Sequence, residues 1–126
     1  MEKKVIRTDN APAPIGPYSQ AIQYGDMLFV SGQIAIEPAT GELVQGDIQL
    51  ETRQVMENIE AILAAAGMNF SNVIKSTIFL MDMGQFAMVN EVYGYYFADN
   101  PPARETVQVA GLPKGVNVEI SVVAGR

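Results

Sequence analysis

The feature that most limits the possible folds is one long helical stripe of apolar residues, set between runs that favour β-strands. From Asp47 onward, apolar and small side chains recur at the spacing of one face of an α-helix. The members of this stripe are Ile48, Thr52, Val55, Ile59, Ile62, Leu63 and Ala66. Asp47 fits the N-cap of the helix and Gly67 its C′ position. We expect four charged residues away from the stripe to face solvent: Glu51, Arg53, Glu57 and Glu60.

The segments around this helix predict a mixed sheet and a second helix. Lys3–Arg7 is a short edge strand, and two further strands, 21–24 and 27–30, flank a Gly25-Asp26 turn as a hairpin. Val73–Leu80 is apolar and β-branched, as in a buried strand. Residues 85–97 favour a helix that ends before Pro101 and Pro102. Two last strands, 105–110 and 116–124, are joined by the 111–115 turn.

This order predicts an α+β sandwich in which one mixed sheet carries two helices on one face. A chain of 126 residues fits one domain, which we place at residues 1–126. The low charged fraction of 17% favours an oligomer, in which some surface is buried against other subunits, over the alternative of a compact monomer.

Alternation along the last two strands predicts which side chains share a face of the sheet. Val107 and Val109 point one way, whereas Arg104, Thr106 and Gln108 point the other way. In the final strand, Glu119 and Ser121 oppose the valine and isoleucine positions. We therefore expect an apolar face beneath the helices and a mixed, polar face where subunits meet.

Charge and composition exclude several functions. The net charge is −6 and the eight basic residues are scattered apart from Lys3, Lys4 and Arg7, which argues against a nucleic-acid partner. Without cysteine or histidine there is no disulfide, no thiol nucleophile and no histidine metal ligand or base. The start of the chain lacks the apolar run of a signal peptide, and no apolar run is long enough to span a membrane. We expect a cytoplasmic protein with no metal and no membrane partner.

Arg104 and Glu119 are the charged residues whose positions demand an explanation. Arg104 begins a β-type run, and an arginine there needs a carboxylate partner. That partner is either a protein acid, such as Glu105 or Glu119, or an anionic ligand. Glu119 lies among β-branched residues, so it either forms an interface salt bridge or holds a water for attack, with its pKa raised by burial.

Other candidates have structural alternatives of similar weight. Tyr18 follows a proline-rich segment and either walls a cleft or fills an interface core. Gly32 allows close approach of a ligand to the backbone and Ser31 could add a bond, although both also fit a plain strand end. On the second helix, Asn90 and Tyr93 are interpreted as structural or lining residues, and Phe86 as core or pocket wall.

Three blocks together resemble the YjgF/RidA family of enamine/imine deaminases. They are residues 15–20 (IGPYSQ), 30–34 (VSGQI) and 101–115 (PPARETVQVAGLPKG), in the order and at the spacings of the family. The resemblance extends from about residue 11 to 124. It implies a chorismate-mutase-like fold and a homotrimer with clefts between subunits.

The resemblance implies a 2-iminobutanoate/2-iminopropanoate deaminase without a cofactor, acting on small 2-imino acids that become 2-keto acids. Arg104 would grip the substrate carboxylate, the backbones of Gly32 and Thr106 would orient it, Glu119 would position water, and Tyr18 would complete the cleft. Two departures stand out: Thr106 replaces a common cysteine, and Gly111 replaces a common arginine. The alternative from another class is a ligand-binding regulator or holdase-type chaperone.

The geometry of the last two strands gives one further expectation. If these strands pair as a hairpin, Glu119 lies near the turn and Arg104 lies at the far end. Six residues of strand separate Arg104 from the turn, so the two residues are about 20 Å apart. We therefore expect the active site to combine residues of two chains.

Overall fold

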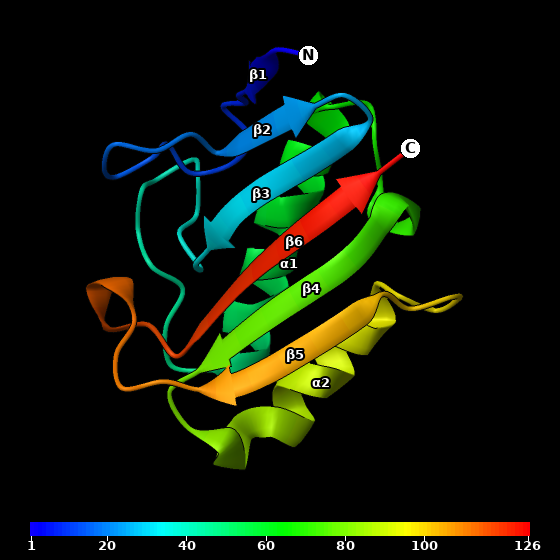
Figure 1. The fold of residues 1–126 in the computed structure, drawn as a ribbon. Coiled ribbons are helices and arrows are strands. Elements are labelled where there is room, and N and C mark those ends of the chain that lie inside the picture. Colours follow the sequence, from blue (N-terminus) through cyan, green and yellow to red (C-terminus); the bar gives the residue numbers. More distant parts are fainter.

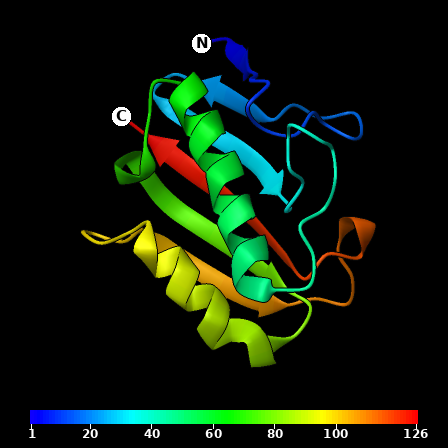
Figure 2. The same cartoon turned by 180° about the vertical axis from the view of Figure 1, so that it is seen from behind.

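The computed structural model describes residues 1–126, which form one twisted sheet with two helices on one face (Figures 1 and 2). The strands are β1 (Lys3–Ile6), β2 (Ala21–Tyr24), β3 (Met27–Gln33), β4 (Val73–Leu80), β5 (Ala103–Gln108) and β6 (Val118–Gly125). The helices are α1 (Ile48–Ala65) and α2 (Phe86–Tyr95), with three short 3₁₀ turns, η1 (Phe70–Asn72), η2 (Met83–Gln85) and η3 (Pro113–Gly115). The strand order across the sheet is β1-β2-β3-β6-β4-β5. The predicted α+β architecture is confirmed.

Helix α1 begins and ends as its sequence predicts. The Asp47 side chain accepts hydrogen bonds from the backbone N–H groups of Gln49 and Leu50, which caps the first turn. Gly67, just past the helix, has a φ of +71°, a conformation that glycine adopts without strain. The apolar stripe packs on the sheet, and Val55, Ile59, Ile62 and Leu63 are fully buried.

The prediction that Glu51 faces solvent is wrong. Glu51 is 2% exposed, and its carboxylate accepts hydrogen bonds from the backbone at the start of β6. Its position explains the burial, because Glu51 lies three residues after Ile48 and four before Val55 and so shares their face of the helix.

The expected hairpin between the last two strands is also wrong. β5 pairs in parallel with β4, whereas β6 lies on the other side of β4 and pairs antiparallel with both β4 and β3. The reason is the β4-α2-β5 crossover: a strand that returns after a helix lies parallel to its predecessor, and β6 then fills the central place.

The facing predicted for β5 is reversed. Arg104 pairs with Ser76 and Thr106 with Ile78, and both β4 residues are buried under the helices. Arg104 and Thr106 therefore lie on the helix-covered face, while Val107 pairs with Phe79 on the open face and is 42% exposed. Glu119 also pairs with Phe79, so it lies on the open face as expected.

The open face is mixed in character, as predicted. Phe29 and Val107 are exposed there, together with the ion pair between Lys75 and Glu105. Neither helix is long and apolar enough to cross a lipid bilayer.

Candidate active site

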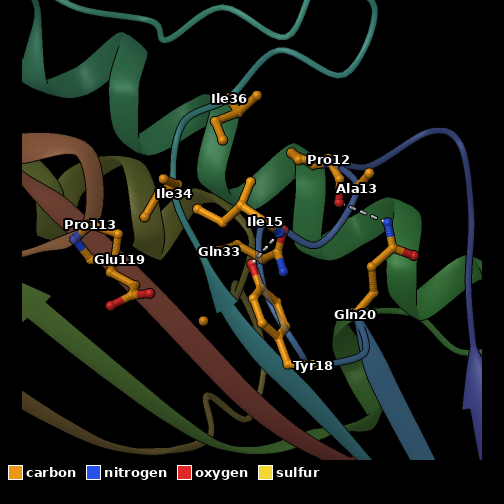
Figure 3. A pocket seen from close by; sticks show the side chains of 11 residues that line it. Pro12, Ala13, Ile15, Tyr18, Gln20, Gln33, Ile34, Ile36, Pro113 and Glu119 are labelled. Atoms are coloured by element: carbon orange, nitrogen blue, oxygen red, sulfur yellow. Dashed lines mark hydrogen bonds between the residues drawn. The ribbon is translucent and has the colours of Figure 1, made fainter.

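The residues predicted to carry chemistry fall into two clusters on opposite sides of the sheet. The first, which we call the arginine cluster, joins Arg104 on β5 with Phe86, Asn90 and Tyr93 on α2. The second, the glutamate pocket, brings together Glu119, Gly32 and Tyr18 (Figure 3). Neither cluster alone holds all the predicted groups.

In the arginine cluster, the guanidinium of Arg104 is held without any acid. Its Nη1 donates a hydrogen bond of 2.6 Å to Oδ1 of Asn90. The guanidinium carbon lies 5.0 Å from the ring centre of Tyr93 and 5.6 Å from that of Phe86, distances typical of cation–π contacts. The only salt bridge of the chain joins Lys75 and Glu105, at 3.1 Å. Within one chain, therefore, Arg104 has no ion-pair partner.

Tyr93 has a structural role, which is one of the two roles expected for it. Its hydroxyl donates a 2.9 Å hydrogen bond to Oγ of Ser76, beneath the guanidinium. Burial raises the pKa of Tyr93, while the Ser76 bond and the charge of Arg104 act in the opposite direction. The phenol therefore stays neutral, and its ring is a fixed platform for Arg104. The sequence carries a signal for this position of Tyr93. It lies two helical turns after Phe86 and one turn before Phe97, so the three aromatic residues share one face of the predicted helix.

Thr106 offers its backbone to a ligand, but not its side chain. The N–H of Val109 donates to the carbonyl of Leu80, so the amide of residue 109 points toward β4. Because amides alternate along a strand, the N–H groups of Arg104 and Thr106 point away from β4, to the free edge of the sheet. The hydroxyl oxygen of Thr106 is shielded from solvent and has no hydrogen-bond partner.

In the glutamate pocket, the carboxylate of Glu119 lies directly over Gly32. A Cβ atom at residue 32 would lie 2.6 Å from Oε2 of Glu119, so any larger residue here would force the Glu119 side chain to move. The register of β3 against β6 shifts between Val30 and Gln33, and Gly32, which lies within this irregular stretch, lines the pocket. Burial raises the pKa of the Glu119 carboxyl, which makes its ionised form a stronger base.

Tyr18 forms the opposite wall of this pocket. The pocket has a volume of about 40 Å³, enough for little more than a water. The Tyr18 side chain is 47% exposed, and its phenol oxygen accepts a 3.3 Å hydrogen bond from the backbone N–H of Ile15. Its hydroxyl proton therefore remains available to a ligand.

Buried Gln20 fixes the segment that carries this wall. Its side-chain amide donates to the carbonyls of Thr8, Ala11 and Pro12, and its Oε1 accepts from the N–H of Thr8. Strand β3 is tied to the same segment, because the Ser31 hydroxyl donates a 2.6 Å hydrogen bond to the carbonyl of Ser19. Ser31 thus has a structural bond, and its role in substrate binding stays a prediction.

The two clusters cannot serve one small ligand within a single chain. Arg104 is level with Ser76 on β4, whereas Glu119 is level with Phe79, and β4 separates the two strands. Three residues along the strands and two strand spacings place their Cα atoms about 14 Å apart, with side chains on opposite faces. Nowhere does the chain gather three or more acidic side chains that could hold a metal ion.

Comparison with known proteins identifies the family of the chain. The family model described as endoribonuclease L-PSP matches residues 8–125. Protein DfrA of Myxococcus xanthus is 57% identical over 98% of this chain and 96% of its own. The 2-iminobutanoate/2-iminopropanoate deaminase of Mus musculus is 48% identical over 97% of this chain and 90% of its own. The crystal structure of E. coli TdcF with bound serine is 45% identical, with a TM-score of 0.94 over 98% of each chain.

The chain belongs to the endoribonuclease L-PSP family, which is the YjgF/RidA family expected from its three sequence blocks. Its relatives support imine and enamine deamination as a role at the level of the family.

Proposed function

We propose that this protein hydrolyses small 2-imino acids, such as 2-iminopropanoate and 2-iminobutanoate, to 2-keto acids and ammonia. Water adds to the carbon of the C=N bond and one of its protons passes to nitrogen, which gives a carbinolamine. The hydroxyl proton of the carbinolamine then passes to the same nitrogen as the C–N bond breaks, which forms the C=O group of the keto acid and releases ammonia. Enamines such as 2-aminoacrylate enter the same route after tautomerising to imines. The ammonia takes up a proton to leave as ammonium.

The observation that carries this proposal is the acid-free setting of Arg104. Its guanidinium is oriented by Asn90 and packed against two aromatic rings, yet no carboxylate of the chain neutralises it. A fixed guanidinium fork matches the two oxygens of a carboxylate, which every 2-imino acid carries. The outward N–H of Thr106, two residues along the same edge, is suited to the same anion.

Glu119 is suited to hold the attacking water. Its ionised carboxylate accepts a hydrogen bond from water and can take its proton, and the raised pKa brings this basicity closer to neutral pH. Tyr18 can donate its hydroxyl proton to the substrate or to the water from across the pocket. Because imines also hydrolyse unaided, a small set of groups is sufficient.

We further propose a homotrimer in which the arginine cluster of one subunit meets the glutamate pocket of the next. The mixed open face and the unpaired edge of β5 are surfaces that such an assembly would cover. A cleft between subunits would bring the two clusters to one ligand, which the geometry of one chain prevents.

The test generates the imine in place with an amino-acid oxidase and follows its decay with and without the purified protein. Arg104→Ala should lose the acceleration, whereas Arg53→Ala, at an exposed arginine of α1, should retain it. No acceleration by the wild-type protein, together with binding of stable 2-keto acids, would instead favour the ligand-binding regulator. Equal rates in Arg104→Ala and wild type would remove Arg104 from the reaction.

A further inference from the structure

Glu51 is the one charged residue among the buried residues of the chain, and the proposed reaction does not use its carboxylate. Oε2 of Glu51 accepts a 2.8 Å hydrogen bond from the N–H of Asn117 and a 3.3 Å bond from the N–H of Val118. Oε1 accepts a 3.0 Å bond from the Asn117 side chain. A residue of the first turn of α1 thereby holds the two residues that precede Glu119.

Both backbone polar groups of Asn117 are held by hydrogen bonds. Its N–H is bound by Glu51, and its carbonyl accepts a 3.1 Å bond from the N–H of Met81, at the end of β4. Pro113, another wall of the glutamate pocket, lies four residues before this point and Glu119 lies two residues after it. We call the three hydrogen bonds from Asn117 and Val118 to Glu51 the tether. The tether lies between Pro113, which lines the pocket, and Glu119, which is carried by β6.

We propose that Glu51 is a positioning residue for Glu119: it sets the place of that carboxylate over Gly32 by binding the backbone of residues 117 and 118. The inference rests on the proposed function only for its effect on turnover. The clearance above Gly32 is small, so a shift of β6 by a fraction of an ångström changes how far Glu119 is covered and where its oxygens point.

Substitutions separate this role from a general contribution to folding. Glu51→Ala removes all three bonds and leaves two backbone N–H groups without their acceptor. Glu51→Gln keeps one oxygen for both N–H groups and turns its amide toward Asn117, whose side chain can flip to accept it. Glu60→Ala, at an exposed acid of the same helix, is the matched control.

The first measurement is the pKa of the Glu119 carboxyl, followed by ¹³C NMR, which needs no activity. Tyr18 is the other titratable residue that lines the pocket, so its phenol is followed in the same titration. In Glu51→Ala the pKa of Glu119 should fall toward its ordinary value, because the carboxylate becomes more hydrated. In Glu51→Gln and Glu60→Ala it should stay at the wild-type value.

The second measurement is imine hydrolysis. Glu51→Ala should lower kcat about tenfold or more, with KM within about twofold, because the tether acts on the water-holding group and not on the arginine cluster. Asn117→Asp places two carboxylates opposite each other and should lower kcat similarly. Adding Glu51→Gln should restore the rate, since the amide introduced at position 51 can donate to the new acid.

The outcomes are separable from those of the proposed function. A wild-type protein without hydrolysis overturns the function, while the Glu119 titration still tests the tether. A folded Glu51→Ala protein with the wild-type pKa of Glu119 overturns the tether. If Glu51→Ala does not fold, the Asn117→Asp variant takes its place. A wild-type pKa of Glu119 and a wild-type rate in Asn117→Asp overturn the positioning role of Glu51. So does a double variant, Asn117→Asp with Glu51→Gln, that does not regain the rate.

Discussion

Arg104 and Glu119 project from opposite faces of one sheet, with β4 between the strands that carry them. This arrangement replaces the hairpin expected from the sequence. It separates the two side chains by the sheet itself as well as by distance. Distance alone could be bridged by a flexible arginine, but a side chain cannot reach through a hydrogen-bonded sheet. The proposed site therefore depends on a second chain.

Mixing of inactive subunits tests that dependence. Arg104→Ala and Glu119→Gln chains, each inactive alone, should regain activity when they are unfolded together and reassembled. In a trimer with one site per interface, random mixing at equal amounts leaves about a quarter of the sites with both native residues. Exchange is verified by native mass spectrometry with one partner tagged. Proven exchange without recovered turnover would place both residues in one chain's site.

Arg104→Lys tests the fork of the arginine rather than its charge. Lysine retains the positive charge, but it loses the paired donors and the flat stacking on Tyr93 and Phe86. Losing a bidentate, partly desolvated contact costs about 2–4 kcal/mol of transition-state binding, which lowers kcat/KM roughly 30-fold to 1,000-fold. Steady-state kinetics with the oxidase-generated imine measure this loss. A lysine variant with wild-type kcat/KM would mean that charge alone suffices.

Glu119→Gln removes a base whose pKa is raised by burial. The amide keeps the shape of the side chain, so ligand binding should persist while kcat falls roughly 100-fold. In the wild-type protein, kcat should fall as the pH drops through the raised pKa of Glu119, at a higher pH than an exposed carboxylate would give. Normal turnover in the variant would leave Glu119 with a structural role only.

The same substitution has a consequence for stability, with a definite sign. Between the ordinary pKa of an unfolded glutamate and the raised folded value, the folded chain holds a proton that the unfolded chain has released. The free energy of unfolding contributed by Glu119 therefore falls as the pH rises through this window. Glu119→Gln should be more stable than wild type above the window, and the difference should vanish below it. Urea denaturation at several pH values measures this difference.

Gly32→Ala tests the close contact beneath Glu119. The added Cβ would meet Oε2 at 2.6 Å, so the carboxylate must move, and we expect kcat to fall about tenfold or more with the fold retained. Gly111→Ala is the matched control, because no atom lies within 4 Å of its added Cβ. Circular dichroism checks the fold, and equal kinetics for the two variants would show that Glu119 tolerates displacement.

Binding of RNA should be weak and nearly insensitive to salt. With a net charge of −6 and scattered basic residues, the chain has few counterions to displace from a nucleic acid. Filter binding of a labelled RNA between low and physiological salt measures the slope. Tight binding that weakens steeply with salt would contradict this expectation and would favour RNA as a ligand or substrate.

The elements of the fold could be predicted from the sequence because they are set by local patterns. The stripe of α1, its caps and the β-branched run of β4 each favour one structure over few residues. The order of strands could not be predicted so directly, because the pairing of β6 depends on the crossover through α2 and not on the adjacent turn. Val107 lies on the open face although it is apolar, because this face also carries apolar side chains, so apolar character alone does not mark the helix-covered face.

The candidate site was predictable in its members but not in its arrangement. Arg104 lies on the helix-covered face because its side chain packs against the aromatic rings of α2, a contact that no β-strand pattern reports. The spacing of Glu51 to Ile48 and Val55 favours burial, but its charge alone predicts a solvated side chain. The backbone groups that donate to its carboxylate lie 66 and 67 residues away in the chain, beyond the reach of local patterns.

The free edge of β5 carries a consequence for the newly made chain. Until that edge is covered, its outward N–H and C=O groups can form hydrogen bonds with a strand of another chain, which is a common first step of aggregation. Charged residues near such edges act as gatekeepers, and Arg104 and Glu105 sit in this strand. The arginine proposed to recognise the substrate would thus also guard the chain before it assembles. Substitutions made to probe chemistry at Arg104 should therefore be expressed and purified with solubility measured alongside activity.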